Sequence, residues 1–152
     1  KAKPMLDMAA LSYAGVGIAQ HDATIILFTD KYERLVVRPI TYIRNVMGHA
    51  AWSPYIPTPN HPEYPSGHAT TNSAVLGVLT HHFGENFQIT LHTYDYLPLP
   101  SRSYNSFDEM SKEMSDSRVY GGIHYQLSCE NSLVQGKLVA ANVIAMVKFK
   151  KE

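Results

Sequence analysis

Apolar residues recur at helical spacing along most of this 152-residue chain, and turn-forming residues divide them into separate runs. The pattern predicts helices over residues 5–18, 22–37, 40–47, 66–83, 107–118 and 125–148. Arg38-Pro39 ends the second helix, and Gly84 stops the fourth. Ser106 and Glu109 form a capping box before the fifth. We therefore expect an all-α fold, a helical bundle.

Two stretches interrupt the helical pattern. Between Gly48 and Gly67 the chain carries five prolines and three large aromatic residues: Pro54, Pro57, Pro59, Pro62, Pro65, Trp52, Tyr55 and Tyr64. This composition predicts a long, stiff, Pro-rich loop before the central helix, and loops of such length usually serve a function. Residues 87–96 alternate enough to predict a short extended segment.

In the last predicted helix, seven apolar residues are expected to face the core: Leu133, Val134, Leu138, Val139, Val143, Ile144 and Val147.

Composition narrows the class of protein. Hydrophobic residues make up 45% and charged residues 17%, which excludes a disordered chain. The length suits one domain over residues 1–152. A formal net charge of zero argues against nucleic acid as the main partner. We expect no membrane span, because no apolar run approaches the ~18 to 20 residues that crossing a bilayer requires.

Lys31 and Arg38 are the first pair of residues that suggests chemistry. They lie seven positions apart, nearly two helical turns, so on one continuous helix both side chains project from the same face. They are then placed to converge on one anion. Two solvated basic residues on a helix surface explain the spacing equally well.

The segment Pro65-Ser66-Gly67-His68 opens the central helix. Unpaired N–H groups and the helix dipole favour anions at such an N-terminus, and glycine lets an anion approach the backbone closely. For Ser66 by itself, a plain N-cap is the simpler interpretation.

Arg118 and His124 lie six positions apart, on different faces of a continuous helix. Gly121-Gly122 between them predicts a turn that swings His124 back towards the group that Arg118 contacts. A helix C-cap followed by a packed histidine is the alternative.

Together these segments read K-x6-R-P from Lys31 to Pro39, P-S-G-H from Pro65 to His68, and S-R-x5-H from Ser117 to His124. This triple pattern resembles the superfamily of vanadium-dependent haloperoxidases and type-2 phosphatidic acid phosphatases (PAP2), with soluble bacterial haloperoxidase-like members the most similar. The resemblance implies a helical bundle of that type. It also implies that the chain is the C-terminal catalytic part of a longer, exported or periplasmic bacterial protein. Upstream helices or a second copy of the chain would then cover its apolar surface.

The resemblance assigns roles to these residues. Vanadate is the implied cofactor, and phosphate fits the same site. The implied oxoanion-binding residues are Lys31, Arg38, Ser66, Gly67, His68 and Arg118. A neutral His124 would be the axial vanadium ligand. His68 would take a proton from hydrogen peroxide, Lys31 would polarise the bound peroxide, and halide would leave as hypohalous acid. Lys31, His68 and His124 are thus the implied catalytic residues.

Two other functions stay open. An acid phosphatase would cleave a phosphate monoester through a phosphohistidine at His124. The superfamily's phosphatases typically carry aspartate four residues after this histidine, where this chain has Ser128, and this difference favours the haloperoxidase. Glu130 is a possible substitute, but on a helix it points to another face than His124. The third candidate is an oxoanion-binding chain without catalytic activity.

A zinc site is the weakest candidate, because the spacing of the remaining histidines gathers no set of three or four ligands. We interpret His49, His61, His81, His82 and His92 as surface or packed residues.

Overall fold

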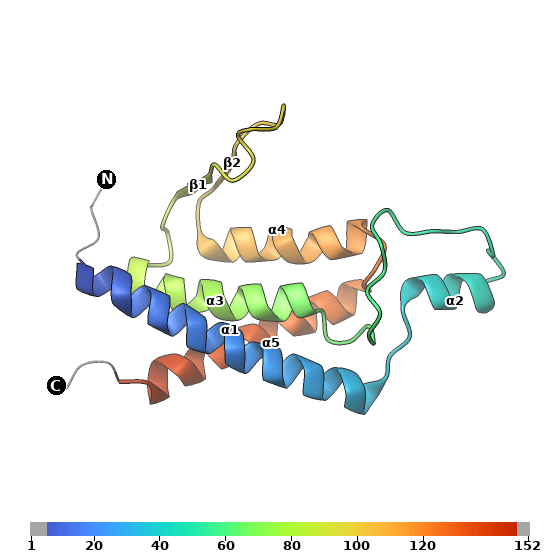
Figure 1. The fold of residues 1–152 in the computed structure, drawn as a ribbon, viewed down its shortest axis with the longest axis horizontal. Coiled ribbons are helices and arrows are strands. Elements are labelled where there is room, and N and C mark those ends of the chain that lie inside the picture. The colour runs from blue at the N-terminus through green and yellow to red at the C-terminus, as the bar shows by residue number, and fades with distance from the viewer. Residues whose placement is uncertain (1–5, 149–152) are drawn as a thin grey trace.

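A computed structural model describes residues 6–148 and confirms the all-α expectation. Its helices are α1 (Leu6–Arg34), α2 (Pro39–Asn45), α3 (Gly67–Phe83), α4 (Phe107–Tyr120) and α5 (Gln126–Met146). A small antiparallel hairpin, β1 (Ile89–Leu91) and β2 (Arg102–Tyr104), lies between α3 and α4 (Figure 1). The predicted start of the first helix at Met5 lies outside the described residues.

The central helix of the bundle is α3, which packs against α1, α4 and α5 (Figure 1). The core is built mostly of small and β-branched residues: Ala19, Ala23, Ala74, Val78, Val139, Ala140 and Val143. Small side chains let the helices approach closely. At Gly136 on α5, an added Cβ would collide with the backbone carbonyl of Thr70 and with Ser73 on α3. Glycine is therefore required where α3 and α5 cross.

The first two predicted helices are one continuous helix, so the predicted break between residues 18 and 22 is wrong. The buried stripe of α1 follows helical spacing through that region, and Ala19 and Ala23 are fully buried in it. Small residues supply this stripe, so a search for large apolar side chains underestimates it. The stripe ends at Lys31. The helix itself ends one turn earlier than predicted, because Leu35 adopts a left-handed backbone conformation with φ of 51°.

The remaining boundaries agree closely with the sequence. Glu109 N donates to Ser106 Oγ at 3.0 Å, which confirms the cap of α4. Gly84 ends α3 with a positive φ of 95°. The extended segment after α3 is confirmed over three residues. Its partner strand, β2, was not predicted, because three residues are too short a run to show alternation.

The core-facing prediction for α5 is partly wrong. Val139 and Val143 are buried as expected, but Val134 and Leu138 are 60% and 62% exposed. Small and polar residues, Ser132 and Gly136, take the inward positions instead. Helix α5 therefore packs closely against α3 and leaves large apolar side chains outside.

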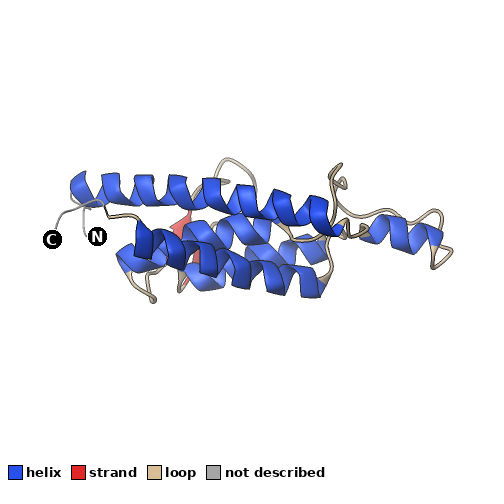
Figure 2. Ribbon diagram, turned by 90° about the horizontal axis from the view of Figure 1, so that it is seen from below, coloured by secondary structure: helices blue, strands red, loops and turns tan. Residues whose placement is uncertain are grey.

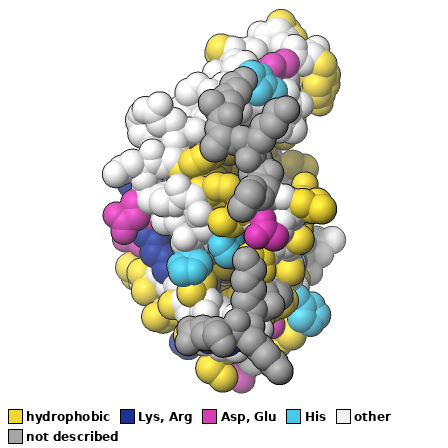
Figure 3. Space-filling model, turned by 90° about the vertical axis from the view of Figure 1, so that its left-hand side faces the viewer, with side chains coloured by type: hydrophobic (Ala, Val, Ile, Leu, Met, Phe, Trp, Pro, Cys, Tyr) yellow, Lys and Arg dark blue, Asp and Glu magenta, His cyan; other side chains and the backbone are white. Residues whose placement is uncertain are grey.

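The two ends of the bundle differ. At one end the Pro-rich loop crosses the tips of the helices and α2 projects beyond them (Figures 1 and 2). At the other end histidine, acidic and apolar side chains intermingle (Figure 3). Within residues 6–148, no helix combines the length and the apolar character that crossing a membrane requires.

Candidate active site

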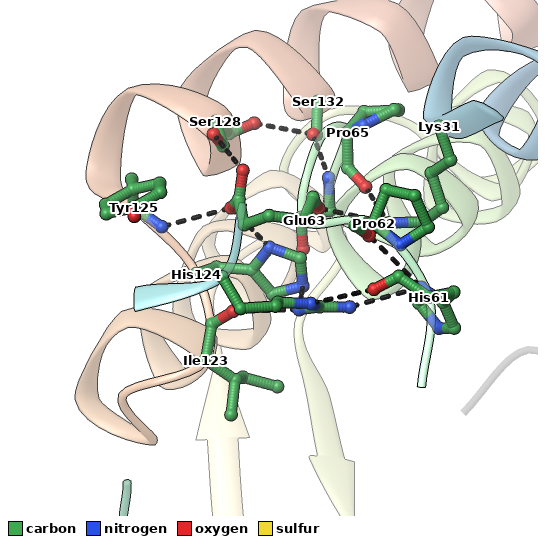
Figure 4. Close-up of polar contacts among 12 residues, drawn as sticks. Lys31, His61, Pro62, Glu63, Pro65, Ile123, His124, Tyr125, Ser128 and Ser132 are labelled. Atoms are coloured by element: carbon green, nitrogen blue, oxygen red, sulfur yellow. Dashed lines mark hydrogen bonds and ion pairs between the residues drawn. The ribbon is translucent and has the colours of Figure 1, made fainter. Parts of the chain in front are cut away.

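Lys31 lies at the loop end of α1 and is fully buried. Its Nζ donates to three backbone carbonyls of the Pro-rich loop, those of Pro62 at 2.8 Å, Glu63 at 3.0 Å and Pro65 at 2.6 Å (Figure 4). An ammonium group has three N–H donors, so these bonds use all of them. The lysine therefore holds the loop against the bundle.

Arg38 is the second buried cation, and it joins the loop to the turn before α5. Its Nε donates to the carbonyl of His61 at 3.0 Å, and its Nη2 contacts His61 Nδ1 at 3.1 Å. Its Nη1 donates to the carbonyl of Ile123 at 2.8 Å and contacts His124 Nε2 at 3.1 Å. These four contacts use four of the five guanidinium N–H groups.

Lys31 and Arg38 come together, but not by sharing a helix face as their spacing predicted. Helix α1 ends at Arg34, and Arg38 is the extended residue that precedes α2. The left-handed turn at Leu35 redirects the chain between them. The charge of Arg38 lowers the pKa of Lys31, as expected for neighbouring cations.

His124 is buried, 5% exposed, and lies between a carboxylate and a guanidinium (Figure 4). The predicted turn is present, since Gly122 has a positive φ of 75°. His124 Nδ1 lies 2.6 Å from Glu63 Oε1, and Nε2 lies 3.1 Å from Arg38 Nη1. Because a carboxylate only accepts and a guanidinium only donates, Nδ1 carries the proton and Nε2 keeps its lone pair.

Glu63 is the residue that sequence reasoning missed. It is fully buried, and its carboxylate also accepts from Ser128 Oγ at 2.8 Å and from the Tyr125 amide at 3.1 Å. The carboxylate partner of His124 thus comes from the loop. Glu130, the substitute considered above, is exposed and bonds to Gln126 instead.

One sequence signal pointed to Glu63: an acidic residue two positions before Pro65, inside the motif-bearing loop. The inference that Ser128 leaves His124 without a carboxylate is wrong. Spacing along the helix that follows His124 shows only nearby residues, whereas the carboxylate partner, Glu63, lies 61 positions away in the chain.

The electrostatics keep His124 neutral and Glu63 ionised. Burial lowers the pKa of His124, and the cations Arg38 and Lys31 add to this against the opposing effect of Glu63. Burial by itself would raise the pKa of Glu63, but the hydrogen bonds from His124 and Ser128 outweigh it, and the pKa falls below the usual value. Burial also lowers the pKa of Lys31, to about 8.

Ser66 precedes α3 as its N-cap residue, but its side chain does not cap the helix. Its amide donates to Ser132 Oγ at 2.8 Å. Its fully buried hydroxyl bonds to no nitrogen or oxygen of the described residues; its polar neighbour is the buried thiol of Cys129, whose pKa it helps to lower against the larger effect of burial. The plain N-cap interpretation of the hydroxyl is therefore wrong. The amide of Gly67 begins α3, where helix N–H groups have no partner inside the helix.

His68 and Arg118 lie at the edge of this cluster. His68 keeps an exposed face on the first turn of α3, and the partial burial of its ring, followed by the charges of Arg118 and His61, lowers its pKa. Arg118 Nε donates to Ser117 Oγ at 3.1 Å. Arg118 also lines a cavity of about 600 Å³ on the α4 side, together with Arg102; neither His68 nor His124 lines it.

The structure thus brings Lys31, Arg38 and His124 into one buried network. Arg118 acts on His68 through its charge, which lowers the pKa of His68. Among residues 6–148, no hydrogen bond joins His124 to a group that Arg118 contacts. The role predicted for the glycine turn, to bring these two residues to one group, is therefore not confirmed. His61, interpreted above as a surface or packed histidine, belongs to the network through Arg38.

The loop end of this helical bundle holds two buried cations, the neutral imidazole of His124 and the first amides of α3. Such a set of groups defines a protein with a binding site for an anion. A family model described as the VCPO second helical-bundle domain matches residues 11–151. The chain belongs to this family, the second helical-bundle domain of vanadium-dependent haloperoxidases. No curated protein matches it.

Solved structures of bacterial enzymes are similar to it. A bacterial vanadium-dependent iodoperoxidase is 36% identical with a TM-score of 0.85, over 90% of this chain and 33% of that one. The holo form of a bacterial vanadium-dependent chloroperoxidase is 23% identical with a TM-score of 0.72, over 85% of this chain and 34% of that one. The latter likeness concerns the fold alone. The chain spans about a third of the length of both.

Proposed function

We propose that the chain carries the active site of a vanadate-dependent peroxidase that oxidises halide with hydrogen peroxide to hypohalous acid. The observation that carries this proposal is the state of His124. Its Nδ1 proton is held by Glu63 and its Nε2 lone pair faces the guanidinium of Arg38. A metal ligand requires a neutral imidazole whose lone pair is on the coordinating nitrogen, and this arrangement leaves it on Nε2.

The chemistry of the site fits an oxoanion such as vanadate. The buried hydroxyl of Ser66 bonds to no nitrogen or oxygen of the described residues and lies beside the thiol of Cys129, and the first amides of α3 adjoin it. A thiol is a weak hydrogen-bond partner, so a ligand oxygen that accepts from this hydroxyl would stabilise the site. Arg38 supplies charge beside His124. A vanadate ion would be held by Arg38, Ser66 and the Gly67 amide, with Nε2 of His124 as the protein ligand to vanadium.

Binding requires one rearrangement of the protein. Arg38 Nη1 contacts the Nε2 atom that the ligand needs, so the guanidinium exchanges this contact for an oxygen of the anion. Such an exchange replaces a bond between the guanidinium and a neutral ring by a bond between opposite charges, which is stronger. Lys31 keeps its three carbonyl partners and contributes its charge rather than a hydrogen bond.

His68 is proposed as the acid–base residue. Its lowered pKa leaves it neutral near pH 7, able to take a proton from hydrogen peroxide, and its exposure gives the reactant access. Bound vanadate supplies Lewis acidity at a constant oxidation state. Arg118, whose charge acts on His68, would stabilise negative charge at the mouth of the site.

Phosphate monoester hydrolysis is the second candidate, and Glu63 is the observation that favours it. A carboxylate on Nδ1 supports an imidazole as a nucleophile, as it does in catalytic triads. Ser128 therefore no longer favours halide oxidation over phosphate ester hydrolysis, because Glu63 supplies a carboxylate to His124. The family and the similar structures favour the peroxidase.

A paired assay tests the proposal. The chain is loaded with vanadate, and peroxide-dependent oxidation of iodide and bromide is compared with turnover of a chromogenic phosphate monoester by the vanadate-free chain. Halide oxidation that His124→Ala abolishes supports the peroxidase. Phosphate ester turnover without halide oxidation contradicts it, and calorimetric vanadate binding without either activity identifies a non-catalytic anion site.

A further inference from the structure

Three donors converge on the buried carboxylate of Glu63 (Figure 4). His124 Nδ1 lies 2.6 Å from Oε1, the Tyr125 amide donates to Oε1 at 3.1 Å, and Ser128 Oγ donates to Oε2 at 2.8 Å. Glu63 has no exposed surface, and His124 is nearly as deeply buried. Both carboxylate oxygens are thus engaged.

We propose that Glu63 is the positioning residue of His124. From the loop, it supplies a negative charge beside His124, at the side that Ser128 also faces. It fixes the proton on Nδ1 and makes Nε2 a stronger electron donor towards the central atom of an oxoanion. The inference rests on the proposed function only in taking Nε2 as the atom that meets the anion.

Holding the loop in place does not require this carboxylate. The loop backbone is already held by Lys31, which donates to the carbonyls of Pro62, Glu63 and Pro65. A neutral glutamine side chain has a carbonyl oxygen that could accept from His124 and an amide that could donate to Ser128. Burying a charge is unfavourable unless the charge interacts with its surroundings, and here the carboxylate accepts from His124, Tyr125 and Ser128.

The geometry also indicates that a carboxylate at position 128 can take the place of the Glu63 carboxylate beside His124. Ser128 Oγ lies 2.8 Å from Glu63 Oε2, so the side chain at position 128 faces the same pocket beside His124. An aspartate at 128 extends into the space that Glu63 would vacate. The pair Glu63→Ala with Ser128→Asp therefore transfers the charge from loop to helix without changing its total.

The test compares five forms of the 152-residue chain: wild type, Glu63→Gln, Glu130→Gln, Ser128→Ala and the double variant Glu63→Ala with Ser128→Asp. Glu130→Gln is the matched control, because it removes an exposed carboxylate from α5. Proton and nitrogen-15 NMR of the His124 ring reports the site of the proton and the strength of its hydrogen bond. Calorimetry gives the affinities for vanadate and for inorganic phosphate separately.

The wild type should show the proton on Nδ1, strongly deshielded by the charged acceptor. In Glu63→Gln this resonance should move upfield. The ratio of vanadate to phosphate affinity should fall roughly 10- to 100-fold, because only vanadate bonds to Nε2. Ser128→Ala, which keeps the charge, should change the ratio less, and the double variant should restore it. Glu130→Gln should match the wild type.

Two results would overturn the inference. One is a wild-type His124 with its proton on Nε2, a measurement that needs no variant to fold. The other is a folded Glu63→Gln that matches Glu130→Gln in both resonance and affinity ratio. Failure of the proposed function looks different: the wild type would show the Nδ1 proton and yet bind vanadate no more tightly than phosphate.

Discussion

The cationic residues of the site belong to two regions with different surroundings. Lys31 and Arg38 are buried, and their donors are used largely by carbonyls of the loop and of the turn before α5. Arg118 is partly exposed, bonds to its neighbour Ser117, and faces an open cavity. Lys31 and Arg38 therefore hold the structure of the site in place, whereas Arg118 can act on a molecule that enters the cavity.

This difference shows that residues of one sequence pattern can have different roles, structural for Lys31 and Arg38 and reactive for Arg118. The buried pair must be satisfied by the protein even when no anion is bound, since an unpaired buried charge is very costly. The partly exposed arginine is solvated and needs no such partner. Removing a residue from each region should therefore produce different losses.

The largest effect is expected at His124, which lies in the buried region beside Arg38. His124→Ala removes the proposed axial ligand, so halide oxidation by the vanadate-loaded chain should disappear, while phosphate binding should change much less because Arg38 and Ser66 remain. Activity assays and calorimetry check this pair of results. An equal loss of vanadate and phosphate affinity would contradict the role of His124 as a ligand.

The next effect concerns stability. Lys31→Met leaves three loop carbonyls without their buried donor and should lower the free energy of unfolding by about 3 to 5 kcal/mol. Urea denaturation measures the change. Lys112→Met is the control, since the exposed Lys112 pairs only with Asp116 one turn along α4, and it should leave the midpoint unchanged.

Arg118→Ala should show the opposite profile. We expect kcat for halide oxidation to fall about 10²- to 10³-fold, as when one charge-stabilising donor is removed, while the unfolding midpoint stays near that of the wild type. Arg102→Ala is the matched control, because Arg102 lines the same cavity. If Arg102→Ala reduces kcat equally, the effect belongs to the general charge of the cavity and not to Arg118.

The smallest effect is on pH dependence, and Lys31 sets its direction. With its pKa lowered to about 8, Lys31 loses its proton as pH rises through 8, and anion affinity should fall up to about tenfold per pH unit above that point. Stability should change in the other direction. Between pH 8 and the ordinary lysine pKa of 10.5 the unfolded chain binds more protons, so this residue makes the fold more stable as pH rises.

Calorimetry of phosphate binding and urea denaturation across this range check the two trends, with Lys31→Met as the reference that should lack both. A wild-type phosphate affinity that stays constant from pH 7 to 10 would show that Lys31 does not contribute charge to the anion site.

Local chemistry made part of this protein readable from the sequence. Apolar periodicity and the cap at Ser106 predicted most helix boundaries, because helices are local structures. Of the motif residues, Lys31, Arg38 and His124 lie in one buried network, whereas Arg118 lines a separate cavity. The glycine turn before His124 was readable as well, since Gly122 adopts a conformation that other residues rarely take.

Only the tertiary structure decided which residues are partners. The pairing of Glu63 with His124 joins positions 61 apart, and no periodicity links them. The burial of Ala19 in preference to large apolar residues such as Leu138 depends on how closely α3 approaches its neighbours. Burial and hydrogen-bond partners arise from contacts distant in sequence, so the charge state of His124 and the tasks of the cations followed from the packed structure.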